Sequence, residues 1–110
     1  MFEKDLKKAY LLDFYGDVLT ERKKEVLDMY YNEDLSLAEI ADQIGISRQG
    51  VRDLIKKAEE ELIFLEEKLG LAQKMSALRI RSDNMLRLAE NGDISPELKK
   101  EIEEISAIIK

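Results

Sequence analysis

Apolar residues along the 110-residue chain recur at intervals of three and four, the spacing that places them on one face of a helix. Near the amino terminus, Leu6, Tyr10 and Phe14 follow this spacing before Gly16. A second apolar set is made of Val26, Leu27, Tyr30 and Tyr31. No segment alternates apolar and polar residues over the length of a strand. The pattern predicts an all-α fold of about six helices.

Capping residues and breakers set the predicted helix boundaries. Thr20 is suited to begin a helix, and Asn32 is suited to end that helix in a left-handed conformation. Ser36 and Glu39 have the spacing of a capping box, in which each side chain accepts a hydrogen bond from the backbone amide of the other residue. The other predicted helices cover residues 3–15, 47–69, 71–90 and a last segment that begins at Ser95-Pro96.

The segment "SLAEIADQIGISRQGVRDLIKKAEEEL", residues 36–62, holds two helical patterns separated by a glycine. Ala41 is small enough to let two crossing helices approach closely, and Gly45 can adopt the positive φ of a tight corner. The apolar residues of both patterns form one inner face, made of Leu37, Ile40, Ala41, Ile44, Ile46, Val51, Leu54 and Ile55. This arrangement is typical of a helix-turn-helix, whose second helix enters the major groove of DNA. The alternative is an ordinary corner between two helices of a bundle.

The outward face of the second helix carries the candidate nucleic-acid-binding residues, which are Ser47, Arg48, Gln49, Gly50, Arg52, Lys56 and Lys57. Arginine can bond guanine bidentately, glutamine can do the same with adenine, and glycine lets a backbone approach closely. The capped start of the helix also offers amide groups to a phosphate. Asp53 would repel phosphates unless it meets a cytosine amino group. The alternative is that these residues are simply the solvated surface of a helix.

The charge of this face differs from the charge of the whole chain. The sequence has 18 basic and 24 acidic residues, a formal net charge of −6. Between Ser47 and Lys57 there are four cations and one anion, a net +3, which leaves −9 for the rest of the chain. One copy would make only about three to four phosphate contacts and would bind weakly at physiological salt. Binding to duplex DNA is therefore expected to need two copies or a partner protein.

Beyond the predicted helix-turn-helix, apolar residues continue with the heptad spacing of a coiled coil. On the long fourth helix they form a candidate dimer seam, made of Ile55, Ala58, Leu62, Leu65 and Leu69. Similar stripes follow on the last two helices, with Leu71, Met75, Leu78, Met85 and Ala89 on one and Leu98, Ile102, Ile105, Ile108 and Ile109 on the other.

These stripes indicate how the chain is organised. We expect a helix-turn-helix domain over residues 1–69, whose long recognition helix extends into a C-terminal helical dimerisation region, a hairpin over residues 70–110. A homodimer is favoured because the last three helices of one chain would by themselves form only a thin core. The alternative is that the stripes are core within a single chain.

Composition argues against several classes of function. The sequence has no cysteine and no histidine, which removes disulfides, thiolate and imidazole metal ligands and a histidine general base. Its carboxylates, lysines and hydroxyls occur in no glycine-rich or nucleophile-elbow context, so we expect no enzyme activity, no cofactor and no metal. No apolar run approaches the ~18–20 residues of a membrane span, and residues 1–5 are too charged for a signal peptide. A cytoplasmic protein without membrane contact is expected.

The segment "LTERKKEVLDMYYNEDLSLAEIADQIGISRQGVR", residues 19–52, resembles the promoter-reading helix-turn-helix domain at the carboxyl end of sigma factors. The wider segment from Leu11 to Leu69 looks more closely like the YlxM-like family, small bacterial helix-turn-helix proteins typically encoded beside the signal recognition particle GTPase. The parts "DFYG", "YYNEDLSLAEIA" and "SRQ" carry most of this resemblance.

The resemblance implies a DNA-binding fold and an accessory or regulatory role in signal-recognition-particle-dependent protein targeting, without enzymatic activity. It places Ser47, Arg48 and Gln49 at the start of the recognition helix. Family members usually read Ala-Val-Tyr or Ala-Val-His at the next positions, where this chain has Gly50-Val51-Arg52.

Three functions are compatible with the sequence. The first is a dimeric reader of duplex DNA. The second is an accessory protein that contacts the particle GTPase or the phosphates and loops of the particle RNA, whose deep and narrow major groove excludes a helix. The third is a protein-interaction module whose acidic body binds a basic partner.

Overall fold

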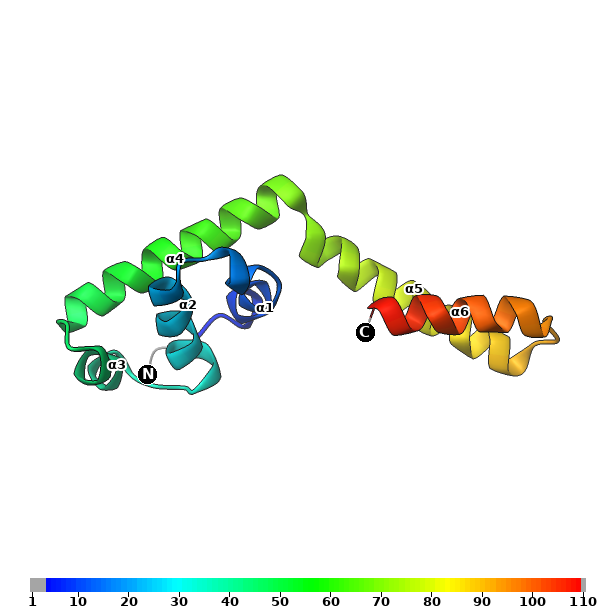
Figure 1. The fold of residues 1–110 in the computed structure, drawn as a ribbon, viewed down its shortest axis with the longest axis horizontal. Coiled ribbons are helices and arrows are strands. Elements are labelled where there is room, and N and C mark those ends of the chain that lie inside the picture. Colours follow the sequence, from blue (N-terminus) through cyan, green and yellow to red (C-terminus); the bar gives the residue numbers. More distant parts are fainter. Residues whose placement is uncertain (1–3, 110) are drawn as a thin grey trace. The chain divides into compact units, whose positions relative to one another are not determined.

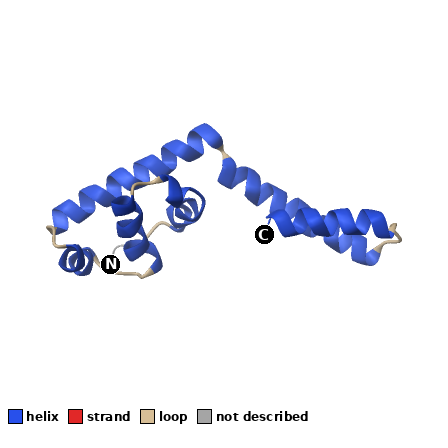
Figure 2. Cartoon of the chain, in the orientation of Figure 1, coloured by secondary structure: helices blue, strands red, loops and turns tan. Residues whose placement is uncertain are grey.

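The computed structural model describes residues 4–109, and every regular element in this range is a helix (Figure 1). The helices are α1 (Leu6–Tyr15), α2 (Glu21–Leu27), α3 (Leu37–Ile44), α4 (Arg48–Leu69), α5 (Leu71–Asn91) and α6 (Pro96–Ile109), with a 3₁₀ turn η1 (Gly16–Val18) and a π-helical turn η2 (Asp28–Asn32). Figure 2 shows no strand in the described range, so the prediction of an all-α fold is confirmed. None of the helices within residues 4–109 has both the length and the apolar composition of a membrane-spanning segment.

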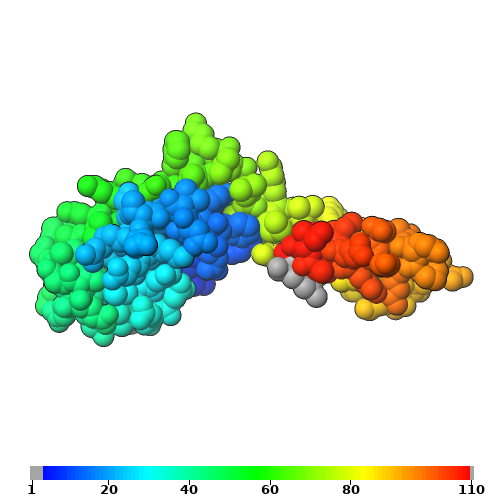
Figure 3. Space-filling view, viewed as in Figure 1, coloured from blue at the N-terminus to red at the C-terminus, as the bar shows by residue number. Residues whose placement is uncertain are grey.

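The chain divides into two compact units between Gly70 and Leu71. In the first unit, α1, α2 and α3 all pack against α4, which is its central element. The buried layer comes from all four helices and includes Leu11, Leu12, Val26, Leu27, Ile40, Val51, Ile55, Ala58 and Leu62. In Figure 3 these segments, coloured blue to green, form one continuous body. Full burial of an aliphatic side chain contributes roughly 1.5–3 kcal/mol, so this layer is the main source of the unit's stability.

Side-chain caps begin the helices at most of the predicted places. Thr20, Ser47 and Ser95 each accept a hydrogen bond from the backbone amide three residues later. One cap was not predicted: the Asp5 carboxylate accepts from the Lys7 amide at 2.9 Å, so α1 begins at Leu6. Glu3, the predicted first residue of this helix, lies outside the described residues.

The helical run of α2 and η2 ends at Asn32, as predicted, but the prediction that Asn32 has a left-handed conformation is wrong. α2 continues into η2, and the residue with a left-handed backbone is Asp34, at a φ of 55°. Asn32 is the last residue of η2, and its side-chain amide donates a hydrogen bond to Asp28 at 2.8 Å. The chain therefore adopts the left-handed conformation two residues after η2, at Asp34. Aspartate is one of the few residues that tolerate this conformation.

The second unit is a helical hairpin in which α6 runs back along α5 after a loop at residues 92–95 (Figure 1). The buried residues of this pair include Ser82, Ala89, Ser106 and Ile109, of which only Ile109 is large. Arg79 Nε donates a hydrogen bond to the Ile109 carbonyl oxygen at 3.1 Å. Several large apolar residues remain exposed, namely Leu78, Ile80, Leu88, Leu98, Ile105 and Ile108. The hairpin therefore buries little apolar surface of its own.

Candidate nucleic-acid interface

The first helix of the predicted motif, α3, begins with the expected capping box. Ser36 Oγ accepts from the Glu39 amide at 3.1 Å, and Glu39 Oε1 accepts from the Ser36 amide at 3.1 Å. The hydrogen bond from the Ser36 backbone is the main cause that holds the pKa of the Glu39 carboxyl below its usual value, with a smaller contribution from the Ser36 side chain. The prediction of a capping box is confirmed.

Gly45 forms the corner between α3 and α4, with a φ of 74°. Its amide donates to the Ala41 carbonyl oxygen at 2.9 Å, and Ala41 itself is buried. A Cβ on residue 45 would meet no atom within 4 Å, so glycine is required here by the backbone conformation and not by lack of space. The glycine corner expected of a helix-turn-helix is therefore present.

The candidate nucleic-acid-binding residues lie together on the solvent-facing side of α4. Ser47, Arg48, Gln49, Arg52, Lys56 and Lys57 are exposed, and Gly50 is half-buried. The opposite side of the helix holds the buried Val51, Ile55 and Ala58. Within residues 4–109, the four cations of this face form no ion pair. Their contact with nucleic acid stays a prediction.

Asp53, the one anion on this face, is hydrogen-bonded to a neighbour. Gln49 Nε2 donates to Asp53 Oδ1 at 3.0 Å, across one turn of α4. Sequence reasoning treated the two residues separately and missed this contact, although their spacing of four residues is the signal for it. The contact orients the Gln49 side chain and leaves the amide oxygen of Gln49 available as an acceptor.

The space beside Gly50 is lined by its own chain. A Cβ at this position would lie 3.2 Å from Ser47 Oγ and 3.3 Å from Ile46 Cδ1. The close approach of a ligand backbone to Gly50 therefore stays a prediction.

Three residues of the candidate dimer seam belong instead to the core of a single chain. Ile55, Ala58 and Leu62 are buried, in a helix that packs against α1, α2 and α3. Their assignment to a contact between two chains is wrong, because heptad spacing identifies a buried helix face but not the segment that covers it. Leu65 is half-buried and Leu69 exposed, and any part they take in a dimer stays a prediction.

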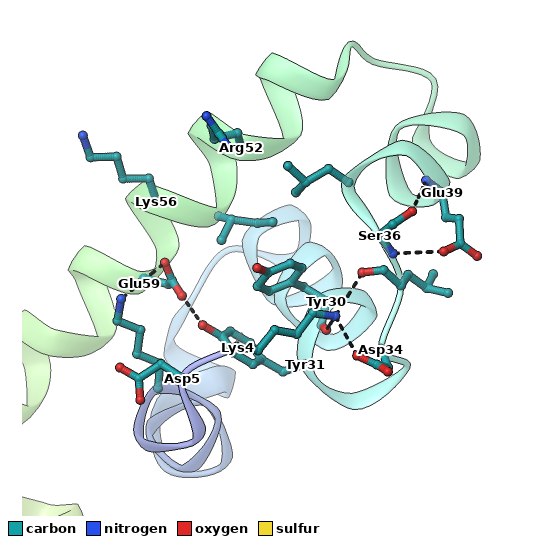
Figure 4. Close-up of a pocket in the computed structure, with 14 residues that line it drawn as sticks. Lys4, Asp5, Tyr30, Tyr31, Asp34, Ser36, Glu39, Arg52, Lys56 and Glu59 are labelled. Carbon is teal, nitrogen blue, oxygen red and sulfur yellow. Dashed lines mark hydrogen bonds and ion pairs between the residues drawn. The ribbon is translucent and has the colours of Figure 1, made fainter. Parts of the chain in front are cut away.

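A pocket of about 710 Å³ lies beside this face, between α4, the start of α1, η2 and the start of α3 (Figure 4). Lys4 closes one side of it: Lys4 Nζ pairs with Asp34 at 2.9 Å, donates to the carbonyl oxygens of Tyr30 and Leu35, and lies 4.2 Å from the centre of the Tyr30 ring. Arg52 and Lys56 of the candidate interface line the same pocket.

Tyr31 and Glu59 form the other side of this pocket. The Tyr31 hydroxyl donates a hydrogen bond to Glu59, which also pairs with Lys8 at 3.7 Å. Burial raises the pKa of both Tyr30 and Tyr31, and for Tyr31 the hydrogen bond to Glu59 raises it further. Sequence reasoning missed this pocket because its walls come from segments far apart in the chain, and only the adjacent tyrosines gave a local signal.

Comparison with known proteins gives a match over almost the whole chain. Residues 2–106 match the family described as "UPF0122: Putative helix-turn-helix protein, YlxM / p13 like". A UPF0122 protein of Thermoanaerobacter sp. (strain X514) is 42% identical over 103 residues, which cover 91% of this chain and 88% of the relative. A UPF0122 protein of Clostridium perfringens (strain SM101 / Type A) is 43% identical over 97 residues, or 87% of each chain. One of Acetivibrio thermocellus is 49% identical over 87 residues, which cover 79% of this chain and 74% of the relative.

Proposed function

Because this chain belongs to the UPF0122 family of YlxM-like helix-turn-helix proteins, we propose that it binds nucleic acid as a regulatory or accessory protein and is not an enzyme. The family resemblance expected from the sequence is confirmed, and it extends past Leu69 into α6. Our proposal names duplex DNA as the ligand, contacted in its major groove by the first turns of α4. It also includes a role in signal-recognition-particle-dependent targeting, which the resemblance implies.

The observation that carries this proposal is the set of unpaired cations on α4. Lys4, Lys8, Lys23 and Lys24 of the first unit each pair with an acidic side chain. Lys7 and Arg22 form no ion pair within residues 4–109, but they lie on two different helices, α1 and α2. Arg48, Arg52 and Lys56 have no such partner among the described residues, although the chain has more acids than bases. Cations that an acidic protein leaves together and unpaired on one helix face are suited to an anionic ligand.

The positions of these side chains suggest how the contacts divide. Arg48 and Gln49 lie in the first turn of α4 and Arg52 lies one turn later, where side chains of a recognition helix reach base edges. Lys56 and Lys57 lie further along, where a helix leaves the groove, and are suited to phosphates.

We propose that the exposed face of the hairpin supplies a homodimer contact. In a pair of antiparallel helices, the core positions are those that face the other helix. The residues directly before these core positions lie on one common side of the pair. On α5 these residues are Leu78 and Met85, which come before the half-buried Arg79 and Leu86, and on α6 Ile105 comes before the buried Ser106. Leu98 lies seven residues before Ile105 and so falls on the same side. Ile108, at 82% exposure, extends the same side. Covering this face with a second hairpin would give a four-helix bundle.

The charges on this face favour a second copy as its partner. Arg81 lies between Leu78 and Met85, and Glu101 lies between Leu98 and Ile105, each at helical spacing and each exposed. The face therefore carries one charge of each sign, and two-fold symmetry can bring opposite charges of two copies together. A dimer also doubles the number of phosphate contacts, and this would raise the weak affinity expected of one copy.

The proposal is tested by titrating the full-length protein with duplex DNA, the particle RNA and the particle GTPase at several salt concentrations. Arg48→Glu combined with Arg52→Glu is expected to abolish binding to nucleic acid and to leave the helical circular dichroism unchanged. The matched control is Lys7→Glu combined with Arg22→Glu, the same charge change at exposed positions of α1 and α2, and should keep most of the affinity.

Two outcomes separate the alternatives. If the Arg48 and Arg52 variant binds nucleic acid as tightly as the parent, the proposed face is incorrect. If the parent binds only the GTPase, the acidic body with its net charge of −9 outside residues 47–57 is the functional surface, and the protein is an interaction module.

A further inference from the structure

The pocket beside α4 contains three polar groups without a partner, and we propose that they bind the phosphate group of a small phosphate monoester. These groups are the hydroxyl of Tyr30, the guanidinium of Arg52 and the ammonium of Lys56. Within residues 4–109 no hydrogen bond or ion pair reaches any of them, and Figure 4 shows Arg52 and Lys56 projecting from α4 with no marked contact. All three are donors, so the missing partner must bring acceptors and negative charge.

The acids that line the pocket are, by contrast, all engaged. Asp34 pairs with Lys4, and Glu59 accepts from Tyr31 and pairs with Lys8. The remaining acids, Asp5 and Glu39, accept hydrogen bonds from the backbone at the starts of α1 and α3. The negative charge of the lining is therefore already satisfied by the chain, whereas the positive charge of Arg52 and Lys56 is not.

Tyr30 fixes where the phosphate binds. Only 6% of this residue is exposed, and its hydroxyl end is directed toward α4 (Figure 4). Burial raises the pKa of this hydroxyl, so it remains a donor at neutral pH. The hydroxyl opens onto the pocket and has no acceptor within residues 4–109, and an anion at this point would supply one.

The remaining lining favours a phosphate that carries an organic group. Three donors suit the three terminal oxygens of a monoester, and arginine matches phosphate geometry bidentately. Leu35, Leu37 and Ile55 add an apolar wall that an inorganic ion would leave uncovered. A volume of about 710 Å³ is in the range of pockets that hold small organic ligands.

Binding in this pocket has a consequence for the proposed function, on which this step rests. Arg52 and Lys56 belong both to the pocket lining and to the candidate nucleic-acid interface. A monoester held by both side chains would withdraw two cations from that interface, so the ligand and duplex DNA are expected to compete.

The experiment is a titration of ¹⁵N-labelled full-length protein with phenyl phosphate, inorganic phosphate and phenol, followed by backbone amide shifts. Phenyl phosphate is expected to bind saturably, at least about threefold more tightly than inorganic phosphate, and phenol is expected not to bind. Tyr30→Phe removes only a hydroxyl, and Lys56→Gln removes one exposed charge; each is expected to weaken phenyl phosphate about five- to tenfold. Lys57→Gln is the control, because Lys57 is the next exposed lysine of α4 and does not line the pocket.

The outcomes separate this proposal from the proposed function. The pocket proposal is overturned if phenyl phosphate gives no saturable shift, or if Lys57→Gln weakens it as much as Lys56→Gln does. Duplex binding is measured on the same variants without any monoester. A parent protein that binds phenyl phosphate but no duplex would count against the nucleic-acid function and leave the pocket proposal intact. Duplex affinity that falls in Tyr30→Phe, without any binding of phenyl phosphate, would assign the hydroxyl to a strand phosphate and overturn the small-ligand site.

Discussion

The side-chain amide of Gln49 donates a hydrogen bond to the carboxylate of Asp53, one turn further along the exposed face of α4. Asp53, the one anion on this face, therefore orients the side chain best suited to read adenine. Asp53 is therefore expected to have two opposite effects on duplex affinity. Its negative charge repels phosphates, whereas its hydrogen bond orients the Gln49 side chain.

Substitutions at Asp53 should separate these two effects. Asp53→Asn keeps an acceptor for Gln49 and removes the charge, so duplex affinity should rise about two- to fivefold with unchanged sequence preference. Asp53→Ala should raise affinity similarly and weaken the preference for the base that Gln49 contacts. The measurement is fluorescence anisotropy with a cognate and a scrambled duplex. Lower affinity in Asp53→Asn would instead indicate that Asp53 accepts directly from a base.

Gly50→Ala is expected to stabilise the protein by up to about 1 kcal/mol, because alanine is the better helix former. The new Cβ would lie 3.2 Å from the capping hydroxyl of Ser47. The cap of α3 has the same spacing, and there Ser36 accepts from Glu39, which carries a Cβ. Urea unfolding monitored by circular dichroism measures the change. A loss of stability would mean that Ile46, the other close neighbour, cannot move aside.

The capping box of α3 should make stability depend on pH in a specific direction. Ser36→Ala is expected to cost about 1 kcal/mol at neutral pH. Glu39→Gln keeps an acceptor for the Ser36 amide but cannot ionise. Because the folded-state pKa of the Glu39 carboxyl lies below its usual, unfolded-state value, its ionised form stabilises the fold at and above that usual value. The advantage of the parent over Glu39→Gln should disappear as the pH falls through the folded-state pKa. An advantage that persists at pH 2 would contradict this explanation.

Leu62→Ala is expected to reduce the free energy of unfolding by about 2–5 kcal/mol, since the side chain is fully buried in the first unit. The loss should not depend on protein concentration, because this side chain is covered by its own chain. Leu65→Ala, at a half-buried position of the same helix, should cost less. Chemical unfolding at two protein concentrations tenfold apart checks both points. A loss that grew on dilution would return Leu62 to a contact between chains.

Ile105→Glu should separate two copies, because it places a charge on the exposed apolar face of the hairpin. Light scattering of the parent at micromolar concentration is expected to give twice the 12.7 kDa of one chain, and the variant should give the mass of one. Ala107→Glu adds the same charge at an exposed position of α6 outside this face and should remain a dimer. A parent mass of one chain would refute the dimer.

Local signals in the sequence were sufficient for most helix starts and for the corner of the motif. Ser36, Ser47 and Gly45 act within a few residues of themselves, so their neighbours along the chain determine what they do. Asn32 and Asp34 are both tolerated in the left-handed region. The π-helical turn determines which of them adopts this conformation, and no sequence pattern predicted that turn.

Contacts between distant segments were not predictable in the same way. The ion pair of Lys4 with Asp34 joins residues 30 positions apart, and the hydrogen bond of Tyr31 to Glu59 joins residues 28 apart. Both depend on how α1 and η2 are laid against α4. The pocket is formed by that packing and could not be predicted from the sequence. The exposed cations of α4 could be predicted, because helical spacing alone places them on one face.

Because Ile55, Ala58 and Leu62 are buried, α4, the proposed DNA-contacting helix, is also the central helix of the first unit's core. A helix packed in this way cannot rotate or unfold by itself, because either change would disrupt the buried layer that it forms with α1, α2 and α3. Control of the proposed DNA binding is therefore expected to act by screening or occupying the outer surface of a fixed helix, and not by repositioning that helix.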